Sequence, residues 1–166
     1  MAYNFKDISV LIIDDDKTMK VILANIFKAM KVKECFTAQD GEQGLQLFKT
    51  HKPDIVVTDW SMNNVDGIEL TKAIRAHNRT TKQTTPILLM SGHTSMELVK
   101  KALDAGVTEF LSKPFSVNDL STRVGYIFSK PRDAIDTQGY YGPDRRRRNV
   151  QDFDGPDKRK GEKDDN

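Results

Sequence analysis

The sequence predicts an α/β fold, a five-stranded parallel sheet with helices on both faces. Short apolar, β-branched runs alternate along the chain with segments whose apolar residues recur at helical spacing. Such alternation is typical of a parallel sheet that is covered on both sides. The clearest run, Ile55 to Val57, leads to an acid, Asp59, at the strand end where open α/β sheets bind their ligands. We expect the strand order 2-1-3-4-5, one of the common doubly wound arrangements.

Each expected strand is a short run rich in β-branched and other apolar residues, as buried strands are. Pro53 precedes the third run, and Lys113-Pro114 follows the fifth. The runs are Ile8 to Ile13, Val32 to Thr37, Asp54 to Asp59, Pro86 to Ser91 and Val107 to Ser112.

The helices are predicted from apolar residues three and four positions apart, which share one helix face. A cap at Asp16 or a neighbour should begin the first helix, and Gly106 should close the fourth. The helices are expected after Asp16, after Asp40-Gly41, around Ile68 to Ile74, from Ser95 to Ala105 and from Val117 to Phe128.

Length and composition give one domain of ordinary size, residues 1–130, followed by a tail, residues 131–166. The single Cys35 excludes an internal disulfide and fits a reducing compartment. The first seven residues form no apolar signal region, and no apolar run approaches membrane-spanning length. We therefore expect a protein of the cytoplasm, and we expect a monomer because the domain sequence gives no evidence for dimerisation.

Polar residues end four of the five expected strands. The first strand stops at Asp14 to Asp16, the third at Asp59, the fourth at Ser91 and the fifth at Lys113. Parallel strands end at one edge of the sheet, so these groups should form one pocket. Clustered carboxylates repel one another unless a cation balances them, and oxygen ligands suit Mg²⁺. An ionised aspartate can also be a nucleophile toward a phosphoryl group, on which a lysine places its charge.

Residues 8–129 resemble the receiver domain of two-component response regulators, particularly the stand-alone CheY-like type. The matching pieces are LIIDDD, PDIVVTDWSMNNVDG, PILLMSG and FLSKPF, which occur in this order. The resemblance implies a flavodoxin-like fold with a cis Lys113-Pro114 bond, and a protein that carries a signal rather than an enzyme. It also implies a histidine kinase or phosphotransfer protein as the phosphoryl donor.

The resemblance assigns each pocket residue a role, with Asp16 left as a helix cap. It implies the phosphoacceptor Asp59, the phosphate-binding Lys113, the switch residues Ser91 and Phe110, and the Mg²⁺ ligands Asp14, Asp15, Asp59 and the backbone carbonyl of Ser61.

The tail differs in composition from the domain. Residues 131–166 hold 9 Lys/Arg and 9 Asp/Glu among few apolar residues, so we expect no regular element there and disorder without a ligand. A short repeat is present: Gly142-Pro143-Asp144-Arg145-Arg146-Arg147 recurs as Gly155-Pro156-Asp157-Lys158-Arg159-Lys160. An aromatic residue precedes each copy, Tyr140 with Tyr141 in the first and Phe153 in the second.

This repeat predicts a tail that binds cyclic di-GMP. Arginine pairs bidentately with guanine or phosphate, an aspartate accepts from the guanine N1–H and N2–H₂ donors, and tyrosine offers a stacking face. The tail also resembles the arginine-rich extension of the CheY-like Cle effectors, which implies a flagellar motor-switch partner. The expected ligand-binding residues are Tyr140, Tyr141, Gly142, Pro143, Asp144, Arg145, Arg146, Arg147, Arg148, Asp157 and Arg159.

Two alternatives remain open for the tail. One is a stand-alone, phosphorylation-switched receiver whose charged tail is merely solvated. The other is an arm that holds nucleic acid without sequence specificity through Arg145 to Arg148. The equal numbers of acids and bases in the tail argue against this arm, because nucleic-acid arms are usually more purely basic.

Overall fold

The computed structural model describes residues 3–146 of the 166-residue chain. Five parallel strands form one sheet in the order β2-β1-β3-β4-β5, as the sequence predicts. The strands are β1 (Ser9–Ile13), β2 (Glu34–Ala38), β3 (Ile55–Asp59), β4 (Ile87–Ser91) and β5 (Glu109–Ser112). β1, β3 and β4 are buried along their whole length, which explains their unbroken apolar sequences.

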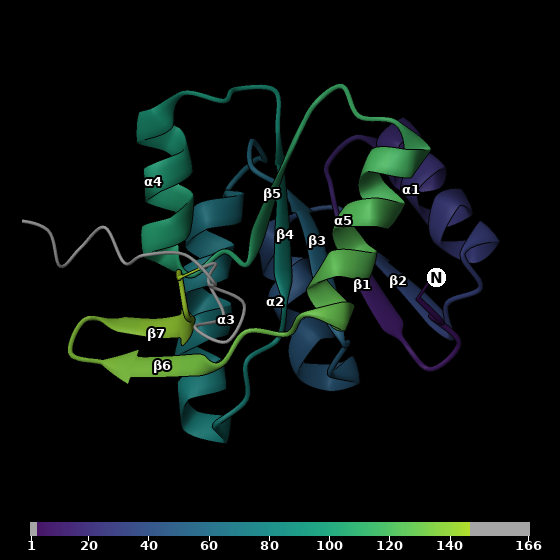
Figure 1. The fold of residues 1–166 in the computed structure, drawn as a ribbon. Helices are drawn as coiled ribbons and strands as arrows, with labels where there is room; N and C mark the ends of the chain where they lie inside the picture. The colour runs from purple at the N-terminus through teal and green to yellow at the C-terminus, as the bar shows by residue number, and fades with distance from the viewer. Residues whose placement is uncertain (1–2, 147–166) are drawn as a thin grey trace, which may run out of the picture.

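Helices cover both faces of this sheet (Figure 1). They are α1 (Lys17–Ala29), α2 (Gly41–His51), α3 (Gly67–Thr81), α4 (Met96–Ala105) and α5 (Val117–Ser129). One core cluster joins the sheet to α1 and α5, including Phe27 and Leu120. Two others join it to α2 and α3, including Leu70, and to α3 and α4, including Ala102. Among the described residues no helix is long and apolar enough to cross a membrane.

Side chains and one glycine set the helix ends where the sequence predicts them. The Asp16 carboxylate accepts from the backbone N–H groups of Thr18 and Met19 and so caps α1. Asp40 caps α2 in the same way. Gly106 ends α4 with φ at 104°, a left-handed conformation that glycine adopts without strain.

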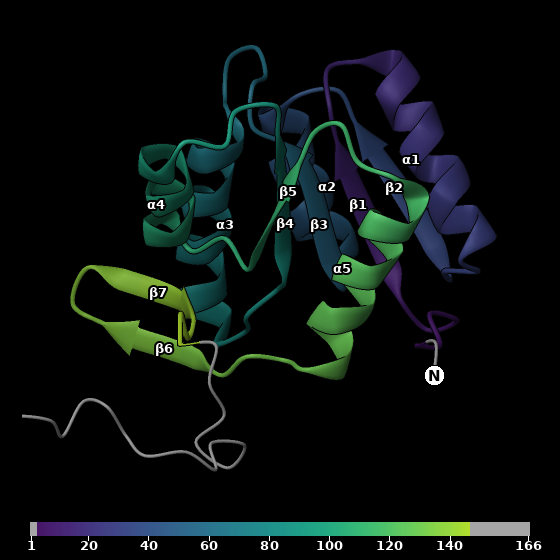
Figure 2. The same ribbon diagram turned by 45° about the horizontal axis from the view of Figure 1, so that its top comes forward.

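The prediction that no regular element follows Pro131 is wrong. Strands β6 (Ala134–Thr137) and β7 (Tyr140–Pro143) form an antiparallel hairpin, which turns at Gly139 with φ at 92°. The hairpin lies across α3 beneath α4 (Figures 1 and 2). It buries Gly142 and Pro143 against the domain, and the Tyr141 hydroxyl donates to the Gln83 carbonyl at 2.8 Å.

The hairpin is ordered because the surface against which it packs belongs to the domain. The composition of residues 131–166 shows only that they cannot build a core of their own, whereas the hairpin packs on the surface of the domain. We call residues 131–146 the C-terminal extension. The expectation of disorder for residues 147–166, and the second repeat at residues 155–160, lie outside the described residues.

Candidate functional site

Three carboxylates gather at the carboxyl ends of β1 and β3. Ligand oxygens of Asp14, Asp15 and Asp59 all lie within 4.8 Å of one another. Asp14 is fully buried and Asp59 is 9% exposed, while Asp15 faces solvent. The parallel pairing of β1 with β3 produces this proximity, because it aligns Ile13 with Thr58 just before the two acids. Sequence reasoning predicted this grouping.

A lysine directly after β5 completes the pocket. The Lys113 Nζ lies 3.1 Å from Asp59 Oδ1 and 3.8 Å from Asp14 Oδ2. Its backbone N–H donates to the Ser91 carbonyl at 2.8 Å, which holds the ends of β4 and β5 together. The Lys113-Pro114 bond is cis, as expected. Ser91 is 4% exposed, and its hydroxyl accepts from the His93 N–H at 3.0 Å.

The carboxylate of Asp14 is suited to a divalent cation. Its Oδ1 accepts from the Asp16 N–H at 2.9 Å, but its Oδ2 is buried without a hydrogen-bond partner among the described residues. Burial, with the nearby charge of Asp59, raises the pKa of Asp14. A buried, unsatisfied oxygen costs free energy, and Mg²⁺ prefers such hard oxygen ligands. Asp14, Asp15 and Asp59 therefore fit a Mg²⁺ ion, and Ser61 follows in the loop after β3.

Two aromatic residues connect the pocket to α4. The backbone N–H of Trp60 donates to Asp59 Oδ1 at 2.9 Å, and the half-buried indole packs on the third core cluster. Phe110, the expected switch aromatic, is half-buried against the same cluster. This cluster consists of Ile68, Leu89, Ala102, Ala105 and Val107. It gives the pocket a continuous apolar contact with the inner side of α4.

The described tail residues predicted to bind a ligand make contacts with the domain and with one another. The Arg145 guanidinium lies 4.7 Å from the Tyr140 ring centroid and 2.6 Å from Asp104 on α4. The Asp144 carboxylate accepts from the Arg146 N–H at 2.9 Å, and this bond lowers the pKa of Asp144. Gly142 and Pro143 are buried. The predicted ligand-binding residues Arg147, Arg148, Asp157 and Arg159 lie outside the described residues.

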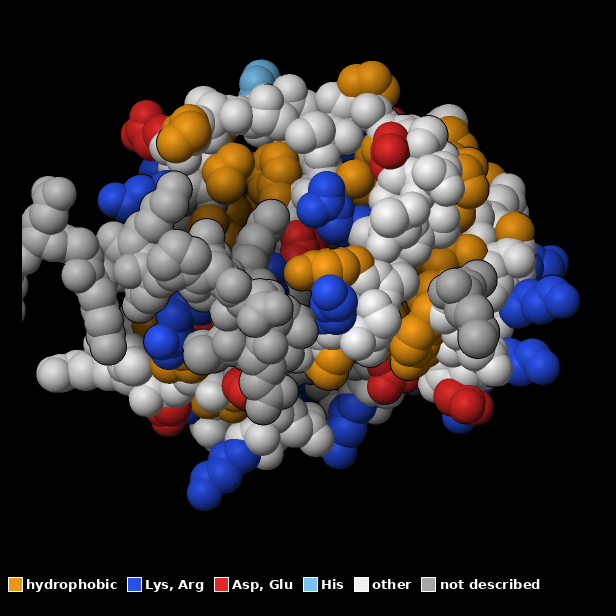
Figure 3. Space-filling model, viewed as in Figure 1, with side chains coloured by type: hydrophobic (Ala, Val, Ile, Leu, Met, Phe, Trp, Pro, Cys, Tyr) orange, Lys and Arg blue, Asp and Glu red, His pale blue; other side chains and the backbone are white. Residues whose placement is uncertain are grey.

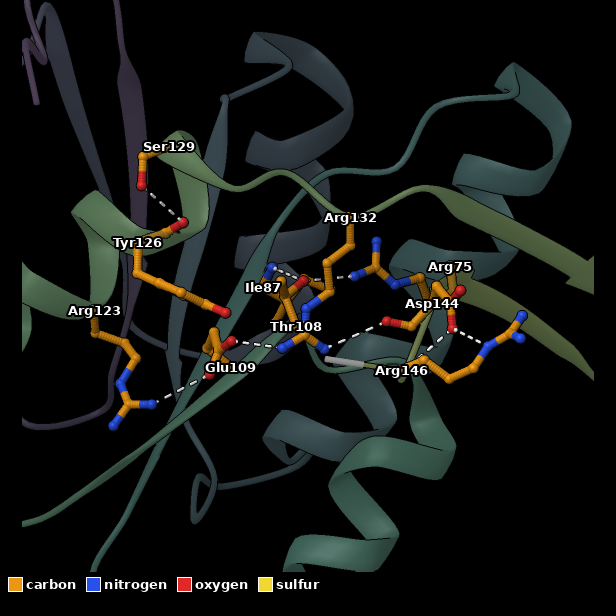
Figure 4. Close-up of polar contacts among 10 residues, drawn as sticks. All are labelled: Arg75, Ile87, Thr108, Glu109, Arg123, Tyr126, Ser129, Arg132, Asp144 and Arg146. Atoms are coloured by element: carbon orange, nitrogen blue, oxygen red, sulfur yellow. Dashed lines mark hydrogen bonds and ion pairs between the residues drawn. The ribbon is translucent and has the colours of Figure 1, made fainter. Parts of the chain in front are cut away.

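Sequence reasoning missed a buried polar cluster beneath the extension (Figure 4). Arg75 on α3 is 3% exposed, and it donates to the Gly106 carbonyl at 2.9 Å and the Thr85 carbonyl at 2.7 Å. Burial lowers the pKa of Arg75 to about 10. Glu109, 2% exposed, accepts from Arg132 of the extension at 2.7 Å. No local pattern reveals these partners, because the chain separates them by many residues.

The comparisons with known proteins agree with this geometry. The model of the response regulator receiver domain matches residues 10–125. The chain is 33% identical over 125 residues to the chemotaxis protein CheY-3 of Vibrio cholerae, covering 75% of this chain and 95% of that protein. It is 31% identical to the transcriptional regulatory protein PdtaR of Mycobacterium tuberculosis, with 78% and 61% covered.

Solved structures show the same architecture. A putative response regulator from Chloroflexus aurantiacus superposes with a TM-score of 0.68 at 30% identity, covering 75% of this chain and all of that one. The receiver domain of the histidine kinase CKI1 from Arabidopsis thaliana, complexed with Mg²⁺ and BeF₃⁻, gives 0.68 at 27% identity, covering 76% and 94%. Receiver domains bind Mg²⁺ at an acidic pocket and interact with histidine kinases or phosphotransfer proteins. This chain belongs to the response regulator receiver domain family.

Proposed function

We propose that the protein is a signalling switch in which the Asp59 carboxylate accepts a phosphoryl group from a phosphohistidine. The observation that carries the proposal is the position of Asp59 between the Lys113 ammonium, 3.1 Å away, and the carboxylates of Asp14 and Asp15. The protein would be a phosphoryl acceptor and carrier of a signal, not an enzyme. No simple structural need explains three acids and a lysine at one edge of the sheet, because mutual repulsion makes such a cluster costly.

The chain's own residues account for the transfer. An Asp59 oxygen attacks the phosphorus, a P–O bond forms, and the P–N bond to the donor histidine breaks; the imidazole then takes a proton from solvent. Lys113 places positive charge beside the oxygen that acquires the group. Mg²⁺ held by Asp14, Asp15, Asp59 and the Ser61 carbonyl would supply charge neutralisation for in-line transfer.

The output would come from the face of α4, β5 and α5. A phosphoryl group on Asp59 would attract the hydroxyl of Ser91, and Phe110 would follow on β5. A groove lined by Phe110, Arg123 and Tyr126 runs along this face. Hydrophobic side chains gather between α4 and α5 in the space-filling view (Figure 3). A partner such as a flagellar motor-switch protein would bind there, as the resemblance to the CheY-like Cle effectors implies.

Mass spectrometry after incubation with acetyl phosphate and MgCl₂ tests this function. The wild-type protein should gain one phosphoryl group, and Asp59→Asn should gain none. Asp16→Asn is the matched control, because asparagine can keep the cap of α1 and Asp16 lies outside the proposed ligand set. An equal gain in Asp59→Asn, or no gain in the wild type, would contradict the assignment.

We further propose that the arginines after β7 bind cyclic di-GMP and so regulate docking to the partner. The support is chemical: the side chains of Arg145 and Arg146 are 45% and 75% exposed, with the Asp144 carboxylate beside them. Their planar guanidinium groups suit guanine and phosphate together. Tyr140, Gly142 and Pro143 would act by holding this segment in place, since their described contacts lie within the protein.

Isothermal titration calorimetry of the intact chain tests this second function. Arg145→Ala combined with Arg146→Ala should abolish heat from cyclic di-GMP, whereas Asp144→Ala should reduce selectivity for guanine over adenine dinucleotides. Lys158→Ala combined with Arg159→Ala is the control in the second repeat. It should reduce the affinity for cyclic di-GMP by less, because lysine lacks the bidentate fork of arginine. Unchanged affinity in the Arg145/Arg146 variant would rule out binding through these arginines, and no heat in the wild type would favour a receiver with a merely solvated tail.

A further inference from the structure

We propose that the C-terminal extension is a built-in regulator of the receiver: its docking on the domain and phosphorylation of Asp59 oppose one another. The proposal rests on the proposed phosphorylation of Asp59 and adds a regulatory element to it. Sites linked in this way have one coupling free energy, so each event must weaken the other by the same factor.

The extension is fastened to α3 on one side. The Arg79 guanidinium on α3 bonds the Asp136 carboxylate, with 3.0 Å from Nε to Oδ1, and donates to the Thr137 carbonyl at 2.9 Å. The Tyr141 hydroxyl donates to the Gln83 carbonyl just beyond the end of α3. These contacts tie one strand of the hairpin to α3 and the other to the segment that follows it.

The extension is fastened to α4 and β5 on the other side. Arg145 pairs with Asp104 in the last turn of α4, and Arg132 pairs with Glu109 at the start of β5. Between them, an added Cβ at Gly142 would lie 2.7 Å from the Tyr140 hydroxyl of the hairpin and 3.3 Å from the Gly106 Cα of the domain. Docking therefore fixes α4 and β5 in one position relative to α3.

A buried arginine reinforces this arrangement from below. Arg75 on α3 donates to the Gly106 carbonyl in the turn from α4 to β5, and its Nη2 donates to the Thr108 hydroxyl at 3.3 Å. Tyr140 of the extension lies near enough to Arg75 to oppose the fall in its pKa. A shift of α4 and β5 against α3 would thus disturb bonds in the domain and in the extension together.

α4 and β5, which bind the extension, are also connected to the phosphorylation pocket through the third core cluster. The third core cluster includes Ala105, next to Asp104, and Val107, next to Gly106. Trp60, whose backbone N–H donates to the Asp59 carboxylate, and Phe110 on β5 also pack against this cluster. Close-packed clusters transmit displacement rather than absorbing it. Motion of α4 and β5 caused at Asp59 therefore reaches the contacts of the extension.

The geometry also gives the sign of the coupling. In the structure with the extension docked, Lys113 bonds an Asp59 oxygen directly at 3.1 Å. A phosphoryl group on that carboxylate would displace this contact and draw Ser91 toward itself, which pulls on the loop from β4 to α4. The docked extension holds α4 against that movement, so it should favour the unmodified carboxylate.

Fluorescence of Trp60, the one tryptophan of the chain, provides the assay. We would titrate the full-length protein with beryllofluoride, a phosphoryl analogue, in the presence of MgCl₂. Gly142→Val places bulk against the Tyr140 hydroxyl and against Gly106, and should undock the extension. Gln138→Val, at an exposed position in the turn of the hairpin, is the matched control. We expect Gly142→Val to bind beryllofluoride about fivefold more tightly than the wild type, and Gln138→Val to bind equally.

Hydrogen exchange of the Asp144 amide, which donates to the Asp133 carbonyl at 2.8 Å, gives a second readout. Beryllofluoride should speed its exchange in the wild type. Tyr141→Phe, which removes one bond to α3, should show an intermediate beryllofluoride affinity. Equal affinity in all variants, weaker binding by Gly142→Val, or an unaltered exchange rate would overturn the coupling while leaving phosphorylation intact. A wild type that binds no beryllofluoride would instead refute the proposed function, and the coupling with it.

Discussion

Replacing Arg132 by alanine tests whether the extension is part of the folded domain. Arg132 is 11% exposed and lies 2.7 Å from Glu109, which is 2% exposed. Removing one partner of a buried ion pair costs roughly 3–5 kcal/mol, because a charge is left poorly compensated. Glu109 keeps Arg123 at 3.3 Å, so we expect the lower value of about 2–3 kcal/mol. For a chain of this length that corresponds to a Tm lower by about 4–12 °C.

The matched control is Arg123→Ala. Arg123 binds the same carboxylate but is 39% exposed, so its loss should cost less than about 1 kcal/mol. Chemical denaturation followed by circular dichroism measures both variants, and a double-mutant cycle with Glu109→Gln should give a coupling of about 1–3 kcal/mol for the Arg132 pair. If Arg132→Ala changes stability by less than about 0.5 kcal/mol, as an exposed substitution would, the described docking is wrong.

Further predictions concern the pocket and the helix ends. Burial raises the pKa of Asp14, so the stability contributed by its protonated form is lost as the pH rises through the folded-state pKa. Without metal, Asp14→Asn should therefore have a higher Tm than the wild type at neutral pH. The Tm values of the two proteins should converge in acid. MgCl₂ should reverse the order in the same melting experiment, because it stabilises only the protein that binds it. Gly67→Ala would place a Cβ 2.5 Å from the Asp59 carbonyl and should cost about 1–3 kcal/mol in urea denaturation, whereas Gly92→Ala, with no atom within 4 Å, should be nearly neutral. Ser116→Ala breaks the capping box of α5 and should cost about 1 kcal/mol by the same measurement, and a neutral result would show that water replaces the cap.

The sequence by itself determined the fold and the place of the pocket. Apolar runs mark the strands of the sheet, and parallel pairing brings their carboxyl ends to one edge, so the acids after β1 and at the end of β3 had to meet. The caps at Asp16, Asp40 and Gly106 were also predictable, because a cap is a local interaction between residues close in the chain. Each of these inferences uses a spacing that can be counted in the sequence.

Only the tertiary structure decided the fate of the extension. Composition shows how much apolar surface a segment itself contributes, and residues 131–146 contribute little. The surface against which they pack belongs to α3, α4 and β5. Likewise Arg75 and Glu109 look like solvent-exposed charges in sequence, yet they are buried. Their partners could not be predicted, because Gly106 lies 31 residues from Arg75 and Arg132 lies 23 residues from Glu109. Such partners are brought together by the packing of whole elements, and no periodicity within one element encodes that packing.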